Sequence, residues 1–508
     1  MRTTNRSFRV LTGGAFALAY LIAGCGKFPG QIDRDPSSFD FSSFGDLDSD
    51  TPEIQLGADG CVAGEARDPA TSECRRVCTL LLNGSNASQG QIAAVSRLSA
   101  GALTIQGSEC PILRVEGSLP PDIIKKMRFE GVNYLELNTS LAKLGRLEID
   151  GRSSGSTVLG QRGSNLSDSK LELPGSLEMR SVQVPLRQQG EMQIFADQGV
   201  PKIAFDKVRI RGGKVGMHLT FAREAATFRS QEQNRSIQFQ ETVIEDSMMP
   251  VLSGYPLPEL NAIHLEQGVA SAKPVIALDL GNYNGAQGVL GPDRTYVLVG
   301  GANLQSGSSL TVEQGTVVKM LGSTLKVHSA VLKARGTAAK PVLFTSQRDD
   351  AGGDTNGDGN AVLPEAGNWM GILVDTNDTT VRSNVSLEHT EVRYGGVSVA
   401  RSNLTMADSS IVSGSICTDG DFTNYGDSGC MALDPNAALN VFYESDVLLT
   451  GVTRLVNVPV DGIRIGSHIA EPGQTKLRVQ GTVSFEGIAG TKLVKEDNDA
   501  TVEGLTVD

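Results

Sequence analysis

The feature that most constrains this chain is a short apolar pattern that recurs along much of its length. Two apolar residues are separated by one spacer, two spacers follow, and two more alternating positions complete the pattern. It occurs in five places: Leu177-Met179-Val182-Val184, Ile203-Phe205-Val208-Ile210, Ile237-Phe239-Thr242-Ile244, Leu325-Val327-Ala330-Leu332 and Leu404-Met406-Ser409-Ile411. Because alternation of apolar and polar residues indicates a half-buried strand, each copy predicts a strand, a one- or two-residue corner and another strand.

Two segments agree beyond this pattern, namely Ile203 to Gly212 and Leu387 to Gly396. Aligned end to end, they place Arg209 and Arg393 at matching positions, which favours a solvated or stacked face over a unique active site. Short strands repeated at irregular spacings of roughly 15 to 35 residues are typical of a solenoid, in which coils stack around one shared core. A β-sandwich is the competing architecture.

The composition also favours a β-rich fold. Glycine is abundant at 58 residues and aromatic residues make up only 5%, which suits many short strands joined by turns. Helices are predicted only at Gly90 to Leu98 and at Pro121 to Met127. A formal net charge of −13 makes nucleic acid and anionic membrane surfaces poor partners and cations better ones.

The first residues are typical of a secretory signal peptide. Three arginines precede an apolar stretch, Ala15 to Ile22, which is too short to span a bilayer. The stretch ends in Ile22-Ala23-Gly24-Cys25, which resembles the bacterial lipobox. That resemblance implies cleavage before Cys25 and a membrane anchor through a lipid on this cysteine. Gly26 in place of Asp favours the outer membrane or cell surface. An ordinary signal peptide is the alternative.

Six further cysteines form an even set in a chain bound for an oxidising compartment, which predicts three disulfides. They are Cys61, Cys74, Cys78, Cys110, Cys417 and Cys430. The last two close a short loop, and we expect them to pair with each other. The first four allow three pairings, among which the sequence does not choose. A zinc site is the alternative for these four, but no histidine lies near them and export favours disulfides.

Composition and motif density divide the chain into five parts. These are a signal peptide (1–24), a flexible acidic tether (25–60), a Cys-rich disulfide-bonded segment (61–115), a β-rich region of irregular coils (116–290) and a β-helix region (291–508) with an acidic insertion at 349–366. The tether is rich in Asp, Ser, Gly and Pro and has few periodic apolar residues, so we expect it to be disordered.

The stretch from Gly307 to about Ser415 resembles the right-handed parallel β-helix repeats of bacterial surface proteins, a pectin-lyase-like family. Four segments carry the resemblance in the family's order: Ser309 to Lys319, Gly336 to Ser346, Gly367 to Ile372 and Val392 to Gly396. The stretch from Gly307 to about Ser415 covers about a fifth of the chain. The resemblance implies an all-β fold, a right-handed parallel β-helix preceded by the Cys-rich segment and the tether.

The acidic insertion contains the one motif typical of metal binding. Residues 354–365 fit the pattern D-x-[DN]-x-[DN]-G-x5-E at every required position. Calcium takes roughly six to eight oxygen ligands, which alternate residues of such a loop supply. The predicted ligands are the side chains of Asp354, Asn356, Asp358 and Glu365 and the backbone carbonyl of Asn360. Flanking helices are not evident, so we expect a calcium-clamped loop. A metal-free acidic turn is the alternative.

Several β-helix families act on polysaccharides, so catalysis must be weighed against binding. The candidate polar residues are Arg209, Arg211, Glu388, His389, Glu391 and Arg393, and the histidines are His218, His264, His328, His389 and His468. None of these forms a recognisable catalytic motif. We therefore expect a noncatalytic surface lipoprotein that binds a glycan or a protein. The alternatives are a surface polysaccharide-active enzyme (lyase, hydrolase or esterase) and a structural or motility component of the envelope.

Overall fold

The computed structural model describes nineteen stretches of the 508-residue chain. They are 65–67, 73–82, 96–99, 102–107, 111–118, 124–160, 170–196, 201–221, 236–247, 249–254, 256–266, 275–283, 287–320, 324–355, 361–376, 381–415, 437–466, 475–496 and 500–506. The signal peptide, Cys25 and the tether lie outside these stretches.

The described residues form an all-β structure with long parallel sheets. They include two short 3₁₀ helices, η2 (Arg152–Ser154) and η4 (Pro258–Ala262), and no α-helix. No helix in the described part of the chain is long and apolar enough to cross a membrane. Strand pairing is parallel apart from two antiparallel pairs near the N-terminus, β1 with β2 and β3 with β4.

The strands belong to three sheets. The 14-stranded sheet contains β1 (Glu65–Arg67), β2 (Cys74–Leu82), β3 (Ser96–Ser99), β4 (Ala102–Gln106), β5 (Ile112–Gly117), β6 (Lys126–Glu130), β7 (Tyr134–Asn138), β8 (Arg146–Asp150), β9 (Thr157–Gly160), β11 (Ser176–Pro185), β13 (Lys202–Arg211), β15 (Ser236–Gln240), β16 (Val243–Glu245) and β18 (His264–Glu266). The 18-stranded sheet contains β10 (Lys170–Pro174), β12 (Glu191–Ala196), β14 (Val215–Phe221), β17 (Met249–Ser253), β19 (Val275–Leu278), β21 (Gln287–Leu290), β22 (Thr295–Leu298), β24 (Ser309–Glu313), β25 (Val317–Met320), β27 (Val331–Arg335), β28 (Val342–Ser346), β30 (Asn384–Glu388), β31 (Thr390–Arg393), β33 (Asn403–Ala407), β34 (Ser410–Val412), β36 (Asp446–Val456), β38 (Lys476–Glu486) and β40 (Thr501–Glu503). The 8-stranded sheet contains β20 (Gly281–Tyr283), β23 (Ala302–Leu304), β26 (Thr324–His328), β29 (Gly371–Asp375), β32 (Val397–Ala400), β35 (Ala437–Phe442), β37 (Asp461–Gly466) and β39 (Leu493–Lys495).

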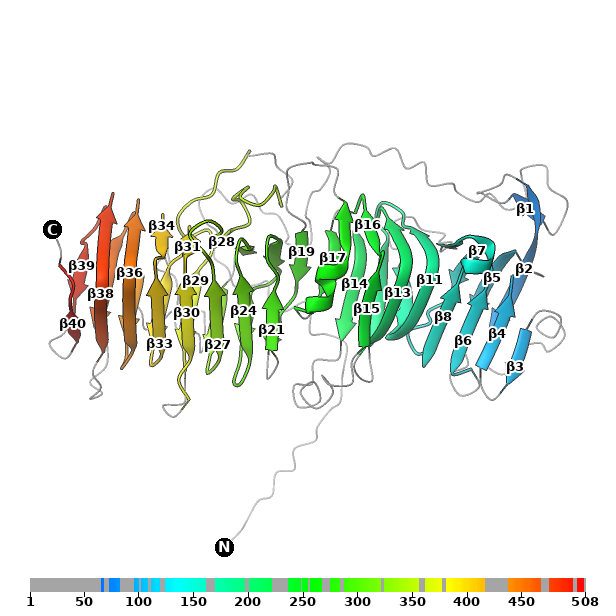
Figure 1. The fold of residues 1–508 in the computed structure, drawn as a ribbon, viewed down its shortest axis with the longest axis horizontal. Helices are drawn as coiled ribbons and strands as arrows, with labels where there is room; N and C mark the ends of the chain where they lie inside the picture. The colour runs from blue at the N-terminus through cyan, green and yellow to red at the C-terminus, as the bar shows by residue number, and fades with distance from the viewer. Residues whose placement is uncertain are drawn as a thin grey trace, which may run out of the picture.

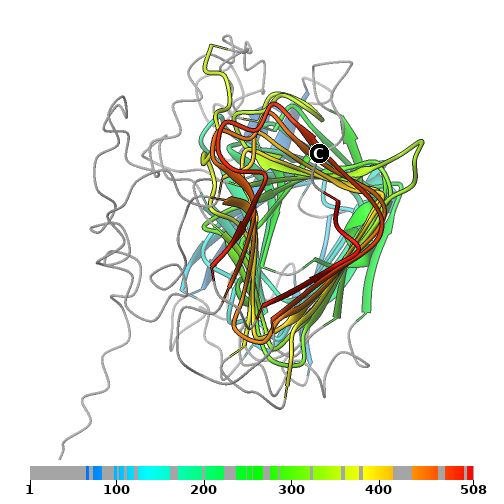
Figure 2. The same cartoon turned by 90° about the vertical axis from the view of Figure 1, so that its left-hand side faces the viewer.

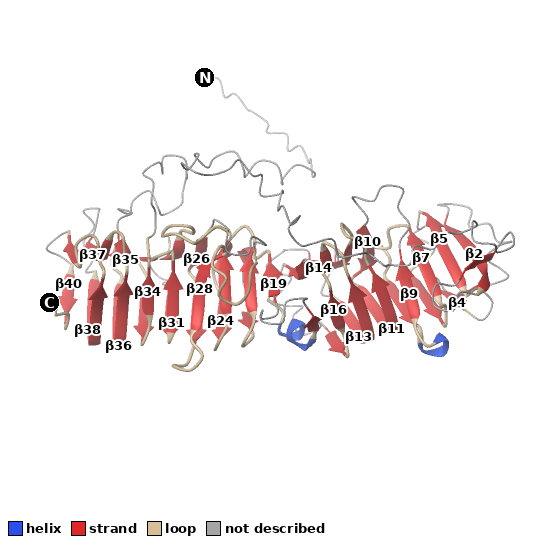
Figure 3. Cartoon of the chain, turned by 90° about the horizontal axis from the view of Figure 1, so that it is seen from above, coloured by secondary structure: helices blue, strands red, loops and turns tan. Residues whose placement is uncertain are grey.

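These sheets give the molecule the shape of a long rod. The strands stack side by side along its axis, from β2 at one end to β40 at the other (Figure 1). Seen along the axis, strands of successive layers lie over one another as the sides of one outline (Figure 2). The two short helices lie at the margin of the strands (Figure 3). One continuous cluster of buried apolar side chains runs from Leu80 to Ala500. The arrangement is consistent with a parallel β-helix.

The structure confirms that the repeated apolar pattern is a strand, a corner and a strand. In each of the five copies, one residue with positive φ stands directly before the third position of the pattern. These corner residues are Ser181 (φ 51°), Lys207 (φ 56°), Glu241 (φ 47°), Ser329 (φ 51°) and Asp408 (φ 48°). Residues other than glycine adopt this left-handed region rarely, mostly at turns. The apolar positions on both sides of each corner belong to the same buried core.

The end-to-end alignment of the two extended copies is wrong by two residues. The corner of the first copy is Lys207 and that of the second copy is His389 (φ 42°). Arg209 thus lies two residues after its corner, whereas Arg393 lies four residues after its own. The residue that matches Arg393 is Arg211. The alignment followed side-chain types, but the corner sets the register of each coil.

The two predicted helices are absent wherever the structure describes their residues. The first range ends in β3 and the second range ends in β6. Strand pairing has overridden local helix propensity in both ranges, through the antiparallel pair of β3 with β4 and the parallel pair of β6 with β4. The strands of the Cys-rich segment also join later ones, because β5 pairs with both β2 and β7 in one parallel sheet.

The cysteine predictions lie mostly outside the described residues. Cys61, Cys110, Cys417 and Cys430 fall in stretches that are not described, and only the backbone of Cys74 is described. Cys78 is half-buried against the core and is disulfide-bonded. Its partner is not among the described side chains, so the three-disulfide pattern and its pairing stay predictions.

Candidate functional site

The acidic insertion leaves the body of the rod at the end of β28 and returns at the start of β29. Its first residues cross the outer side of β22 and β25, where two body side chains hold them. The Thr295 hydroxyl donates to the carbonyl of Gly352 at 2.8 Å, and the Lys319 ammonium donates to the carbonyl of Gly353. The backbone at the start of the insertion is therefore held against the body of the rod.

Lys319 is the most unusual residue of this site. It occupies an outward position of β25, yet its side chain is 0% exposed. Burial lowers the pKa of its ammonium to about 8, against the attraction of Asp349, Asp350 and Asp354. A buried ammonium is costly unless it is paired and hydrogen-bonded. The carboxylates of the insertion supply that compensation.

Asp349 connects the insertion to the neighbouring coil. Its carboxylate accepts from the Thr345 hydroxyl at 2.6 Å and from the Ala351 amide at 3.0 Å. Arg393 of β31 approaches the same carboxylate at 3.3 Å and pairs with Glu391 at 2.5 Å. Asp349 as a whole is only 8% exposed. The three donors therefore replace the water molecules that burial removes from its carboxylate.

The second end of the insertion is held by Trp369. The side chain is 1% exposed, and its indole nitrogen donates to the Arg393 carbonyl at 2.7 Å. It lies against Gly395, where any Cβ would come within 2.5 Å of the ring. The Gly367 amide adds a bond to the Tyr394 carbonyl at 2.7 Å. Both ends of the insertion are thus fixed to the body.

The predicted calcium ligands fall partly within this description. Asp354 and Glu365 are exposed residues near the two fixed ends of the insertion, whereas Asn356, Asp358 and Asn360 lie outside the described residues. Within the described residues, no group of three or more His, Cys, Asp or Glu side chains is placed to hold a metal ion. The five-residue ligand set therefore stays a prediction.

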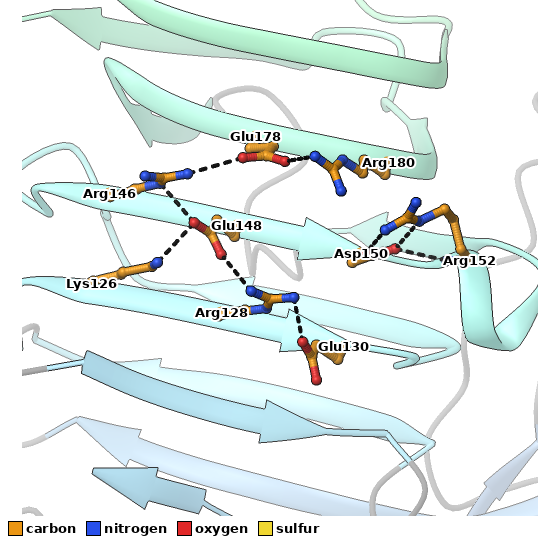
Figure 4. A network of polar contacts seen from close by, with 9 residues as sticks. All are labelled: Lys126, Arg128, Glu130, Arg146, Glu148, Asp150, Arg152, Glu178 and Arg180. Carbon is orange, nitrogen blue, oxygen red and sulfur yellow. Dashed lines mark hydrogen bonds and ion pairs between the residues drawn. The ribbon is translucent and has the colours of Figure 1, made fainter. Parts of the chain in front are cut away.

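A second polar feature lies on the outer face of β6, β8 and β11. Glu148 stands at its centre and contacts three cations: Lys126 at 2.9 Å, Arg128 at 3.4 Å and Arg146 at 2.7 Å (Figure 4). The Glu148 side chain is only 9% exposed. Its negative charge is neutralised by two cations of β6 and one of its own strand, β8.

The network continues to β11 because the strands are parallel and in register. Glu148 lies directly opposite Glu178, and like charges in that relation are destabilising. Arg146 bridges them, since its second nitrogen reaches Glu178 at 3.0 Å, and Arg180 contacts the other oxygen of Glu178 (Figure 4). We name Lys126, Arg128, Arg146, Glu148, Glu178 and Arg180 the charged ladder. Exposed ion pairs of this kind contribute about 0–1 kcal/mol each, so their main effect is on the register of the three strands.

Two further candidate residues, Arg209 and Arg211, are also paired along the coils. Arg209 contacts Glu245 at 2.6 Å, and Arg211 contacts Asp246 at 3.0 Å. These pairs join β13 to the coil of β16. This agrees with the expectation that such residues form a stacked coil face.

The structure does not gather the histidines. His328 contacts Asp375 at 2.8 Å on the 8-stranded sheet, while His218 lies 3.8 Å from Glu191 on the 18-stranded sheet. His389 is a corner residue, and His468 lies outside the described residues. His264 lies on β18 of the 14-stranded sheet, so the four described histidines stand on separate strands and corners.

Sequence reasoning missed Lys319 and Asp349 as partners. Lys319 stands in the run Val317-Val318-Lys319-Met320, where a lysine between apolar residues is a weak indication of an unusual environment. Nothing in the sequence indicates that an insertion some thirty residues later would cover it. Only the stacking of β25 beneath β28 brings the two together.

The chain was compared with known proteins at three levels. It matches no protein-family model, no curated protein and no solved structure. The parallel sheets and the paired polar faces are therefore the basis for the function proposed below.

Proposed function

We propose that this chain is a noncatalytic, lipid-anchored cell-surface protein whose body is a right-handed parallel β-helix. The body presents long polar faces for contact with a glycan or a surface protein. In this proposal the lipid is on Cys25, the location is the outer membrane or cell surface, and calcium clamps the acidic insertion.

The observation that carries the proposal is the pairing of charge on the outer faces. A hydrolase or lyase site needs carboxylates or bases that converge on a substrate. In the charged ladder, Glu148 instead has three cationic neighbours. The carboxylates of this face are thus held by cations and do not converge on a substrate. Such a face suits recognition by many weak polar contacts better than bond cleavage.

Two further arguments support the β-helix and the calcium. Crossovers between parallel strands are right-handed in about 98% of cases, and the described sheets are parallel over nearly their whole length. The rigidity of the loop also raises or lowers its calcium affinity. Lys319 and Trp369 hold the two ends of the acidic insertion.

A polysaccharide panel tests the noncatalytic role. The purified chain is incubated with each polysaccharide, and both retention and new reducing ends or unsaturated products are measured. We expect retention of at least one polymer or protein partner and no turnover.

Turnover that disappears in Glu388→Gln, an exposed candidate carboxylate on β30, and persists in the control Glu130→Gln, whose carboxylate is paired with Arg128, would support the alternative of a polysaccharide-active enzyme. Recovery of an envelope assembly without glycan retention would support a structural or motility role instead.

A further inference from the structure

Arg294 is a half-buried cation that stands directly before β22. Its side chain reaches η4, one of the two short helices at the margin of the strands (Figure 3), where Nη2 donates to the carbonyl of Asn261 at 2.6 Å. The other terminal nitrogen, Nη1, is buried and has no hydrogen-bond partner in the described part of the chain. A guanidinium has several N–H donors, and the described residues satisfy only part of this capacity.

The positive charge of Arg294 also lacks a counter-charge among the described residues. Burial lowers the pKa of its guanidinium, and the group that opposes this effect is Tyr296, not a carboxylate. The carboxylate of the preceding residue, Asp293, is occupied by Lys340, whose ammonium lies 2.7 Å away. Asp293, Arg294 and Lys340 together carry a net charge of +1, from two cations and one carboxylate, in a chain whose formal net charge is −13.

Other buried guanidinium groups show what this fold supplies to such a charge. The side chain of Arg464 is 14% exposed and contacts Asp461 at 2.8 Å and Glu496 at 2.6 Å. The side chain of Arg114 is 18% exposed and lies 3.3 Å from Glu136. Charges that lose water on burial are as a rule paired. The contrast at Arg294 indicates that its negative partner comes from outside the chain.

The side-chain amide of Asn261 provides a second donor beside Arg294. The Tyr296 hydroxyl accepts from the Gly291 amide at 2.9 Å and donates to Oδ1 of Asn261 at 3.2 Å. Because its oxygen is engaged in this way, the Asn261 amide offers its NH2 group as a donor. No described residue accepts a hydrogen bond from that nitrogen, and Asn261 is only half-buried. A cationic donor and a neutral donor therefore belong to two residues in direct contact.

We propose that Arg294 and Asn261 form a binding site for an oxyanion, which is the carboxylate, sulfate or phosphate group of a ligand. A guanidinium binds such a group through charge-assisted hydrogen bonds, which are roughly twice as strong as neutral ones. The bound group supplies the negative charge that the described residues do not provide, and the Asn261 amide adds a neutral hydrogen bond. This site depends neither on the glycan-binding role proposed above nor on calcium in the acidic insertion.

Two variants remove the site in different ways, and a third is the matched control. Arg294→Met removes the positive charge and keeps an unbranched side chain. Asn261→Asp keeps Arg294 and the shape of residue 261 but places a carboxylate where the amide stands, so the chain supplies its own counter-charge. Arg335→Met removes an exposed arginine of β27 and lowers the net charge of the chain by the same amount as Arg294→Met.

The measurement is isothermal titration calorimetry of sodium sulfate, phosphate or acetate into the full chain, with the ionic strength held constant by chloride. We expect saturable binding of at least one of these ions, with a dissociation constant on the order of 1 mM. Tighter binding of acetate would identify a carboxylate ligand, and tighter binding of sulfate or phosphate a tetrahedral one. Arg294→Met and Asn261→Asp should each raise the dissociation constant by roughly tenfold or more, whereas Arg335→Met should leave it unchanged. Thermal unfolding of each variant confirms that it is folded.

Three results would overturn the proposal. One is the absence of saturable binding for all three ions. Another is binding that Arg294→Met or Asn261→Asp leaves unchanged, which would place the anion elsewhere on the chain. The third is equal weakening in Arg294→Met and Arg335→Met, which would reduce the effect to general attraction between charges. If Arg294→Met does not fold, Asn261→Asp alone decides the question, because it retains the arginine.

Discussion

At the scale of single residues, the polar groups of this protein are shaped by what the neighbouring coil places beside them. Lys319 is an outward strand residue whose burial comes from the insertion that crosses it. Glu148 is an outward strand residue whose low exposure comes from three cationic neighbours. The same position in a coil is thus a solvated charge or a buried one, depending on what crosses or flanks it.

Lys319 gives a prediction about stability and pH. Its pKa is about 8 in the folded chain, against an ordinary 10.5. Between these values the unfolded state binds more protons, so stability rises with pH over this window. We expect the free energy of unfolding to gain on the order of 3 kcal/mol from this group between pH 8 and 10.5.

Denaturant unfolding at a series of pH values, with a chelator present, measures this effect. In Lys319→Met the rise should be absent, whereas Lys333→Met, at an exposed position of β27, should keep it. A parallel pH profile for the unmodified chain and Lys319→Met would contradict the assignment.

At the scale of elements, the strand–corner–strand unit and the acidic insertion show how much a local pattern predicts. The five apolar copies predicted the strands and their inward residues, since alternation reports burial directly. The pattern did not identify which spacer adopts positive φ. For this reason the alignment of the two extended copies was wrong by two residues, because the corner of the second copy is His389.

The insertion gives a prediction about metal removal. If calcium bridges Asp354 and Glu365 of the insertion, a chelator should lower the melting temperature of the chain by several degrees, because ligand binding stabilises the folded state. Asp354→Ala or Glu365→Ala should remove this sensitivity.

Differential scanning calorimetry with and without chelator provides the measurement. Glu388→Ala, an exposed carboxylate on β30, is the control and should keep the full response. An unchanged melting curve in the unmodified chain would rule out a calcium clamp.

At the scale of the whole molecule, the rod is one stacked core whose ends differ from its middle. Each coil is covered by its neighbours, so its apolar residues are buried on both sides. In the last described coil several apolar residues that pack against this core are only partly buried.

The proposed anchor is a prediction at this same scale. Cells fed a labelled fatty acid should incorporate it into the chain, and the chain should sediment with membranes. Cys25→Ser should lose the label and become soluble, because the acyl chains provide the membrane affinity. A labelled Cys25→Ser variant, or an unlabelled parent chain, would contradict the lipid anchor.

The sequence by itself determined the all-β class, the repeated strand unit and the inward residues of each copy, because these follow from periodicity within about ten residues. It also supplied the lipobox-like segment and the calcium-like loop as predictions. Only the tertiary structure decided the burial of Lys319 and the charge pairing of Glu148. The physical reason is that each of these depends on which coil lies above or below, and stacking joins residues that are far apart in the chain.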